Sequence, residues 1–188
     1  MDMSAFIAEL EARFEEERAQ DLSELIDELT DAERASVTLA ARLAGAEGEV
    51  TLALRGGATL TGVILDSTRT WVLLQGQRDD SLIMISAIVG AWPLGRSVAR
   101  ESSVRGGVGV GHVLRELGAC DVGVVIESDG GDHRGIINAV YADHVDVALS
   151  GAAFSSDGRD EHVGVTVSLA LAGLRRLRVV GQRWSCDY

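Results

Sequence analysis

The chain has 188 residues, and 46% of them are hydrophobic, which excludes a polypeptide that is disordered throughout. Its formal net charge is −12, and all 17 basic residues are Arg, so DNA is not an expected partner. The acidic, Glu-rich start does not resemble a secretory signal, and no run of 18 apolar residues predicts a membrane span, so we expect a cytoplasmic protein that binds no membrane.

The first segment, residues 1–29, has an acidic, helical composition. Residues 1–36 hold 12 Asp or Glu and 3 Arg. Two apolar stripes at helical spacing run through the segment, one of Met3, Ile7, Leu10 and Phe14 and one of Leu22, Leu25, Ile26 and Leu29. The stripes could cover the rest of the chain, or they could form an arm that binds another subunit or a basic partner.

Residues 30–94 predict a short helix followed by five strands. Thr30 and Glu33 form a capping box at the start of the helix, and Gly45 is suited to end it. The apolar spacing then changes to a period of two, which is typical of strands. The expected strands cover residues 50–54, 58–66, 71–74, 82–85 and 88–92, and Gly62 indicates a bend in the second.

The second half of the chain repeats this pattern. A shift of 73 positions superposes residues 37–76 on 110–149 without a gap, and Gly45, Gly57 and Gly62 fall on Gly118, Gly130 and Gly135. The repeat predicts a linker over 95–109, a second domain over 110–181 and a tail over 182–188. Its strands are expected at residues 122–126, 133–140, 144–149, 163–167 and 174–180.

A helix followed by five short, bent strands resembles the Sm-like fold, including the bacterial Hfq-type proteins. The resemblance rests on residues 50–64, from Val50 to Ile64, on Trp71-Val72-Leu73-Leu74 and on Ile85-Ser86-Ala87-Ile88-Val89. It covers residues 31–92 well and 108–180 loosely. It implies an α+β, mostly β fold with two tandem helix-plus-five-stranded small β-barrels behind an N-terminal α-helical segment.

RNA binding in the Sm-like family uses an Asp or Asn in the turn after the bent strand, and basic or His residues near the last two strands. Here that turn is Ser67-Thr68-Arg69-Thr70, and residues 82–89 carry neither a charge nor a histidine. Arg55, Arg69 and Arg78 are the candidate contacts for RNA or another partner. Three scattered arginines are fewer than strong binding to phosphates needs, so RNA is a disfavoured partner.

No motif predicts catalysis, a cofactor or a metal site. The acidic-His pairs Asp132-His133, Asp143-His144 and Glu161-His162 cannot chelate jointly if each lies on a strand, where neighbours point to opposite faces. Cys120 and Cys186 lie outside any nucleophile motif, so both are expected to be inert thiols. The glycine-rich run 106–111 follows a polar linker rather than a strand, and it predicts a hinge.

The sequence therefore predicts a non-enzymatic binding or assembly module that acts through a protein partner or self-association. The alternative is an RNA-associated Sm-like protein that uses its first barrel. Protein partners fit the acidic charge better than RNA does.

Overall fold

The computed structural model describes Arg18 and residues 34–95, 108–150 and 164–181. The chain divides into two compact units, Met1–Thr38 and Leu39–Tyr188, and the second contains every strand described below. The predicted helical stripes, the capping box at Thr30, Cys186 and the C-terminal tail lie outside the described residues. The domain boundaries predicted from the sequence stay predictions.

The described part of the second unit has two helices and ten strands, each helix preceding five strands. Helix α2 spans Leu39–Ala44 and helix α3 spans Val110–Ala119. Two 3-10 turns, Ile85–Ala87 and Leu171–Gly173, precede the last strand of each half. The strands are β1 (Glu49–Leu54), β2 (Thr59–Ser67), β3 (Trp71–Gly76), β4 (Asp80–Met84), β5 (Ile88–Trp92), β6 (Gly123–Ser128), β7 (Gly131–Val140), β8 (His144–Leu149), β9 (Thr166–Ala170) and β10 (Leu174–Val179).

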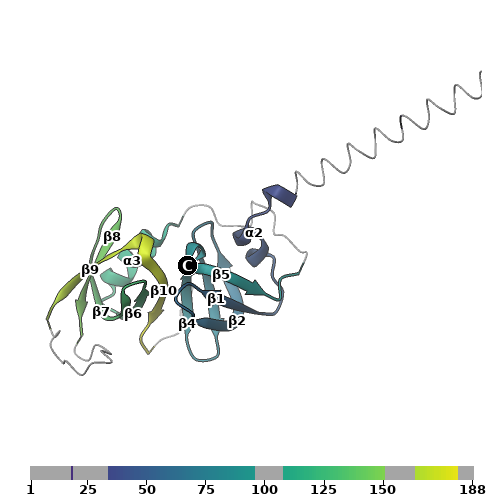
Figure 1. Ribbon diagram of the computed structural model, residues 1–188. Coiled ribbons are helices and arrows are strands. Elements are labelled where there is room, and N and C mark those ends of the chain that lie inside the picture. Colours follow the sequence, from purple (N-terminus) through teal and green to yellow (C-terminus); the bar gives the residue numbers. More distant parts are fainter. Residues whose placement is uncertain (1–17, 19–33, 96–107, 151–163, 182–188) are drawn as a thin grey trace, which may run out of the picture. The chain divides into compact units, whose positions relative to one another are not determined.

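All ten strands belong to one open antiparallel sheet in the order β5-β1-β2-β3-β4-β10-β6-β7-β8-β9 (Figure 1). The predicted mostly β fold is confirmed. The prediction of two closed barrels, and with it the Sm-like resemblance, is wrong, because β4 pairs with β10 and the sheet runs on from one half into the other. The physical reason lies in β4, whose side chains are all buried, so that it needs a neighbour on its second side.

Most strands lie within two residues of their predicted positions. The fourth strand of the second half is an exception, since it begins at Thr166 rather than at residue 163. Helix α2 ends just before Gly45 as predicted, and its Ala40, Ala41 and Leu43 are buried. The alternation of apolar side chains therefore located the strands but did not determine which strands pair.

The two halves share their strand order and their irregularities. Val50 lies opposite Gly62, and Val124 lies opposite Gly135. The β2–β3 pair has a bulge directly after Ile64, and the β7–β8 pair has one directly after Ile137. The gapless alignment is one residue out in the first strand, because the β6–β7 turn is shorter by one residue than the β1–β2 turn. This correspondence assigns each position in β1–β5 an equivalent in β6–β10; a common origin of the halves stays a prediction.

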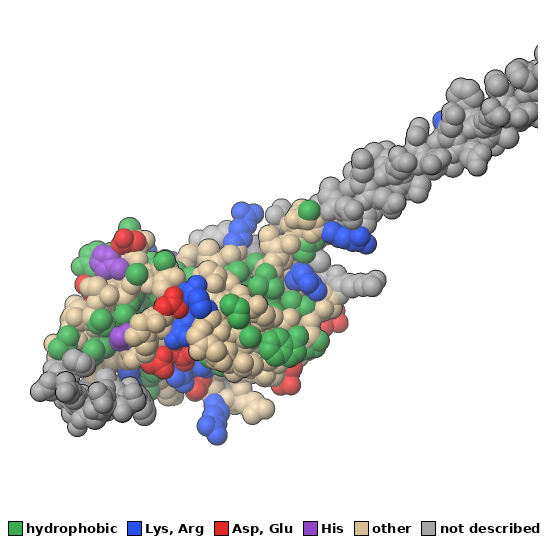
Figure 2. Space-filling view, viewed as in Figure 1, with side chains coloured by type: hydrophobic (Ala, Val, Ile, Leu, Met, Phe, Trp, Pro, Cys, Tyr) green, Lys and Arg blue, Asp and Glu red, His purple; other side chains and the backbone are tan. Residues whose placement is uncertain are grey.

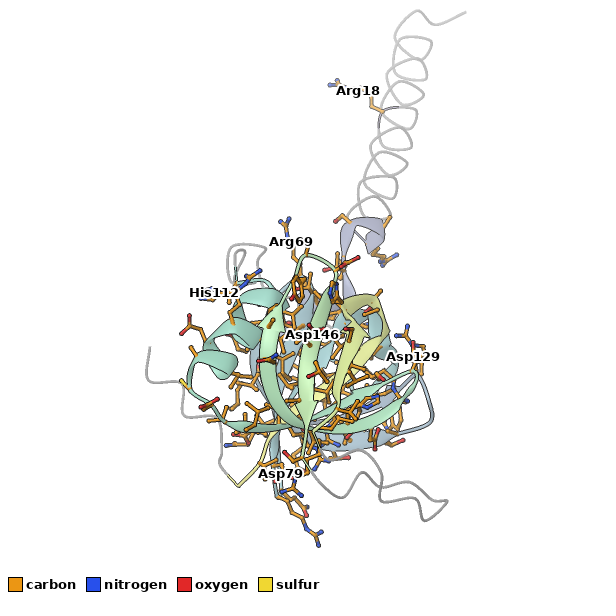
Figure 3. All side chains as sticks on the ribbon, turned by 90° about the vertical axis from the view of Figure 1, so that its left-hand side faces the viewer. Arg18, Arg69, Asp79, His112, Asp129 and Asp146 are labelled. Carbon is orange, nitrogen blue, oxygen red and sulfur yellow. The ribbon has the colours of Figure 1, made fainter. Side chains whose placement is uncertain are left out.

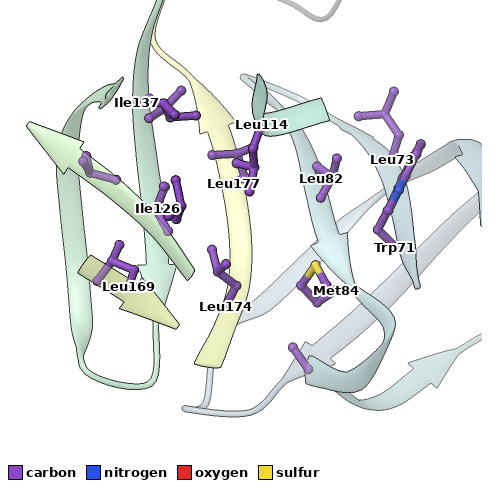
Figure 4. Close-up of a cluster of buried hydrophobic side chains, with 14 residues drawn as sticks. Trp71, Leu73, Leu82, Met84, Leu114, Ile126, Ile137, Leu169, Leu174 and Leu177 are labelled. Atoms are coloured by element: carbon purple, nitrogen blue, oxygen red, sulfur yellow. The ribbon is translucent and has the colours of Figure 1, made fainter. Parts of the chain in front are cut away.

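One apolar cluster crosses from the first half into the second (Figure 4). Leu82 and Met84 from β4 belong to the same cluster as Leu174 and Leu177 from β10. Trp71 is buried in it, and the indole Nε1 donates a hydrogen bond to the carbonyl oxygen of Val108 at 2.8 Å. A second cluster, built around Leu43, lies within the first half. The halves therefore share a hydrophobic core across the β4–β10 pair.

Gly62 permits β2 to lie close to β3, and this closeness can be tested. A Cβ at Gly62 would overlap the carbonyl oxygen of Gln75, and backbone cannot move aside as a flexible side chain can. We expect Gly62→Ala to lower the free energy of unfolding by about 1–3 kcal/mol, as overpacking does. Urea denaturation followed by circular dichroism measures this change. Gly173→Ala is the matched control, since a Cβ there meets no atom within 4 Å; equal effects of the two substitutions would contradict the account.

Candidate docking face

The outer face of strands β5, β1 and β2 is uncharged over most of its length. Strand alternation places seven residues on it, one of them a glycine, and the Thr51 and Thr61 hydroxyls are hydrogen-bonded across it at 3.0 Å. Two charged residues of these strands lie on the same side: Glu49 at the start of β1, and Asp66 near the end of β2, after the bulge that follows Ile64. We call this surface the neutral face: Thr51, Ala53, Thr59, Thr61, Val63, Gly90 and Trp92.

Trp92 is the largest exposed side chain of the neutral face, with 49% of its surface accessible. Its ring lies against Gly90 and next to Ala53, because a Cβ at Gly90 would stand 3.6 Å from Cζ3 of the indole and 3.7 Å from Cβ of Ala53. Val63 adds a second exposed apolar side chain. Figure 2 shows hydrophobic and uncharged atoms over β1, β2 and β5, and a group of red and blue side chains beside them. The face combines a projecting aromatic ring with short neighbours.

The equivalent surface of the second half has the opposite chemistry. Trp92 and Thr61 flank Thr51 in the first half, whereas Arg178 and Arg134 flank Val125 in the second. The other pairs correspond in the same way, and Val63 is matched by Ile136. We call the second surface the charged face: Val125, Glu127, Asp132, Arg134, Ile136, Arg176 and Arg178.

The arginines of the charged face connect β10 to its neighbours on both sides. Arg176 donates to Glu127 on β6 at 3.1 Å and to the Ser81 hydroxyl on β4 at 2.9 Å. Arg178 donates to Asp79, just before β4, at 3.2 Å. Burial lowers the pKa of Arg176, and the nearby Glu127 carboxylate opposes that shift. These arginines therefore bind the two halves together. In the first half, the equivalent positions are Gly90 and Trp92 on β5, which is an edge strand of the sheet.

A second set of contacts joins the ends of the hairpins where the halves meet. Arg55 Nε lies 2.9 Å from the Asp129 carboxylate, and Arg175 donates to the carbonyl oxygens of Arg55, at 2.9 Å, and of Ser128. Gly56 has φ +89°, and the Arg175 guanidinium occupies the space that a side chain there would fill. Arg55, predicted as a partner contact, is thus part of the connection between the halves.

The other two predicted contacts lie far from each other. Arg69 is in the β2–β3 turn and Arg78 is in the β3–β4 turn, so β3 separates them along its whole length. Figure 3 shows Arg69 and Asp79, the neighbour of Arg78, at opposite ends of the sheet. Both arginines are exposed. The structure does not bring Arg55, Arg69 and Arg78 together, and their role in binding stays a prediction.

One acidic-His pair differs from the expectation that its two side chains point apart. Asp143 lies in the turn before β8 rather than on the strand, so its carboxylate reaches the His144 ring at 2.7 Å. The hydrogen bond to His144 and its charge lower the pKa of Asp143, and Tyr141 stacks on the ring at 4.4 Å. Within the described ranges, no group of three His, Cys, Asp or Glu side chains could hold a metal ion. Cys120 is exposed at the end of α3.

A scan against protein-family models finds no match to this chain, and a search of curated proteins finds no similar sequence. No family is therefore assigned, and neither comparison supports the Sm-like resemblance. Of the helices that the structure describes, none is long and apolar enough to cross a membrane.

Arg176 offers a test of how β10 is held, because it pairs with Glu127 within the second half and donates to Ser81 in the first. Arg176→Ala would leave Glu127 partly buried and lacking its nearest cation, although Arg178 Nε remains 3.6 Å away. We expect a loss of about 3 kcal/mol in the free energy of unfolding, the low end for a broken buried pair. Arg134→Ala, which removes an exposed arginine of the same face, is expected to stay within about 0.5 kcal/mol of the wild type. Chemical denaturation of both variants measures the difference, and a near-neutral Arg176→Ala would show that the pair does not hold the sheet together.

Proposed function

We propose that this chain is a non-enzymatic binding and assembly module that docks a protein through its neutral face. The observation that supports the proposal is the contrast between the halves: equivalent positions carry Gly90 and Trp92 in one and Arg176 and Arg178 in the other. The arginines have contacts within the chain that account for them. Trp92, half-exposed at the edge of the sheet, has no such role in the described structure, and a partner protein would give it one.

The energetics of docking favour the neutral face over the charged face. Aromatic side chains surrounded by small, uncharged neighbours are typical anchors of protein interfaces, because they bury apolar area without leaving charges unpaired. A partner that covered the charged face would have to dehydrate Arg134 and Asp132, both exposed. Threonine hydroxyls on the neutral face can keep their hydrogen bonds when covered, as the Thr51–Thr61 pair already does.

RNA binding has less support than protein docking. Arg55 is engaged by Asp129, and Arg69 and Arg78 lie at opposite ends of β3, so the three offer no common track for a phosphate backbone. The cytoplasmic location expected from the sequence stays a prediction.

Two matched substitutions test the proposed docking. Val63 and Ile136 occupy equivalent strand positions on the neutral and charged faces, and each is 37% exposed. We expect Val63→Arg to reduce capture of specific proteins from the native cell at least about tenfold, equivalent to about 1.4 kcal/mol. Ile136→Arg should leave capture unchanged. Quantitative mass spectrometry of proteins retained by each variant gives the measurement, with thermal unfolding as the control for folding. Equal retention by the two variants would contradict the proposal.

A further inference from the structure

Strand β9 ends the sheet, and no strand among the described residues pairs with its second side. We propose that this side binds an extended, basic segment of another protein, which adds to the sheet as a further strand. The inference goes beyond docking through the neutral face, because it uses another edge of the molecule and another kind of contact. Backbone hydrogen bonds give strand addition its affinity, and side-chain contacts give it specificity.

The backbone of β9 presents three residues to its open side. In the ladder with β8, the N–H of Leu149 donates to the carbonyl oxygen of Val165 at 2.9 Å. Because hydrogen-bonded pairs alternate along an antiparallel ladder, the N–H and C=O groups of Thr166, Ser168 and Ala170 point away from β8. All three residues are exposed. An incoming strand therefore meets a row of donors and acceptors in line.

The equivalent side of the first half already holds a strand. Strand β4 corresponds to β9, and its three matching residues are buried where those of β9 are exposed. They are Asp80, Leu82 and Met84. Strand β10 pairs with this side of β4 and places Leu177 opposite Leu82. The fold accepts a strand at this edge in one half and leaves the edge open in the other.

The two ends of the sheet differ in their protection against pairing. The β1–β5 ladder is bulged at Val89, and Pro93, directly after β5, has no N–H to donate. Bulges, prolines and charges are the usual devices that prevent edge-to-edge association. Strand β9 has no charged residue and no proline, and its ladder with β8 runs without a bulge. Of these two edges, β9 is therefore the one suited to pairing.

The outer surface beside β9 sets the chemistry of the occupant. Asp146 lies directly opposite Ser168, whose hydroxyl donates to the carboxylate at 2.5 Å. Asp143, in the turn before β8, adds a second exposed carboxylate. Strands β8 and β9 contain no lysine or arginine. A basic side chain of the incoming strand, opposite Ser168, brings a cation within reach of Asp146.

The inner surface of β9 calls for apolar residues. Leu169 is buried, and Val167 and Leu171 pack against the same hydrophobic cluster. A residue of the incoming strand opposite Leu169 extends this cluster, so an apolar side chain fits there. Since side chains alternate along a strand, the occupant alternates basic and apolar residues.

The open edge of a second copy does not supply such a strand. Strand β5 corresponds to β10, and Ala91 takes the place of Leu177. If β5 repeated the β4–β10 pairing on β9 of another copy, Ala91 would lie opposite Ser168 and bring no cation to Asp146. The occupant is therefore a segment of another protein.

Nuclear magnetic resonance of the isotope-labelled full-length chain tests the strand addition. The probe is a short synthetic peptide that alternates arginine and valine. We expect it to slow hydrogen exchange at the amides of Thr166, Ser168 and Ala170, since each gains a hydrogen bond. A peptide of the same length that alternates glutamate and valine should bind at least about tenfold more weakly, because its carboxylates face Asp146.

Two substitutions separate the contribution of the backbone from that of the charge. Ser168→Pro removes an N–H that points to the open side, a change that edge strands tolerate, and should weaken binding of the arginine peptide at least about tenfold. Asp146→Asn should reduce the preference for the arginine peptide over the glutamate peptide. Asp121→Asn, which makes the same charge change at an exposed site after α3, is the matched control and should leave the preference unchanged.

Four outcomes would overturn the proposal. They are no binding of the arginine peptide at any attainable concentration, equal binding of the two peptides, protection of amides outside β9 only, and self-association of the chain through β9. If Ser168→Pro does not fold, the protected amides of the wild-type chain decide between binding at β9 and binding elsewhere. Loss of protein capture in Val63→Arg is a separate result, because Val63 lies on β2.

Discussion

The pairing of β4 with β10 is the contact on which the rest of the structure depends. The ladder itself is short, since only Arg176 with Ile83 and Leu177 with Leu82 are in register. Two layers reinforce it: an apolar cluster that includes Leu82, Met84, Leu174 and Leu177, and a set of arginine contacts on the outer surface. The apolar layer supplies most of the stabilisation through burial. The arginines fix the position of β10, because their hydrogen bonds require definite partners on β4 and in the turn before it. Without this junction each half would expose a strand edge and an apolar surface.

The same constraint explains why the two halves differ so much on the outside. Their strands correspond in order and register, including the bulges at Val89 and Arg175. In the second half, the last strand has a neighbour, and its outer side chains are arginines that bind that neighbour. In the first half, the last strand is the end of the sheet, and glycine and tryptophan take those positions. The outer side chains of an edge strand have no further strand to contact, so they are free to acquire a binding role. This is the basis of the docking proposal.

Sequence reasoning located the strands well, because the alternation in segments such as Val50–Leu54 reports which side of a strand is buried. It could not identify the β4–β10 pair, because the outward arginines of β10 look like solvated charges until Glu127 and Ser81 are placed beside them. The prediction that each half closes into a barrel followed from the bend expected at Gly62 and from the Sm-like resemblance, and neither shows which strands pair. The neutral face was also missed, although a signal existed: the four outward residues Thr51, Ala53, Thr59 and Thr61 are short and uncharged. The outward residues of separate strands can be seen to form one surface only when the pairing of the strands is known.

Residue-resolved amide hydrogen exchange tests the continuity of the sheet most directly. If β4 and β10 are central strands, the amides of each that face the other should be protected as strongly as those of the neighbouring β3 and β6, because all of them exchange only when the sheet unfolds as a whole. Exchange of those β4 and β10 amides at the rate of edge strands, or two distinct opening free energies for residues 39–95 and 108–181, would contradict the account.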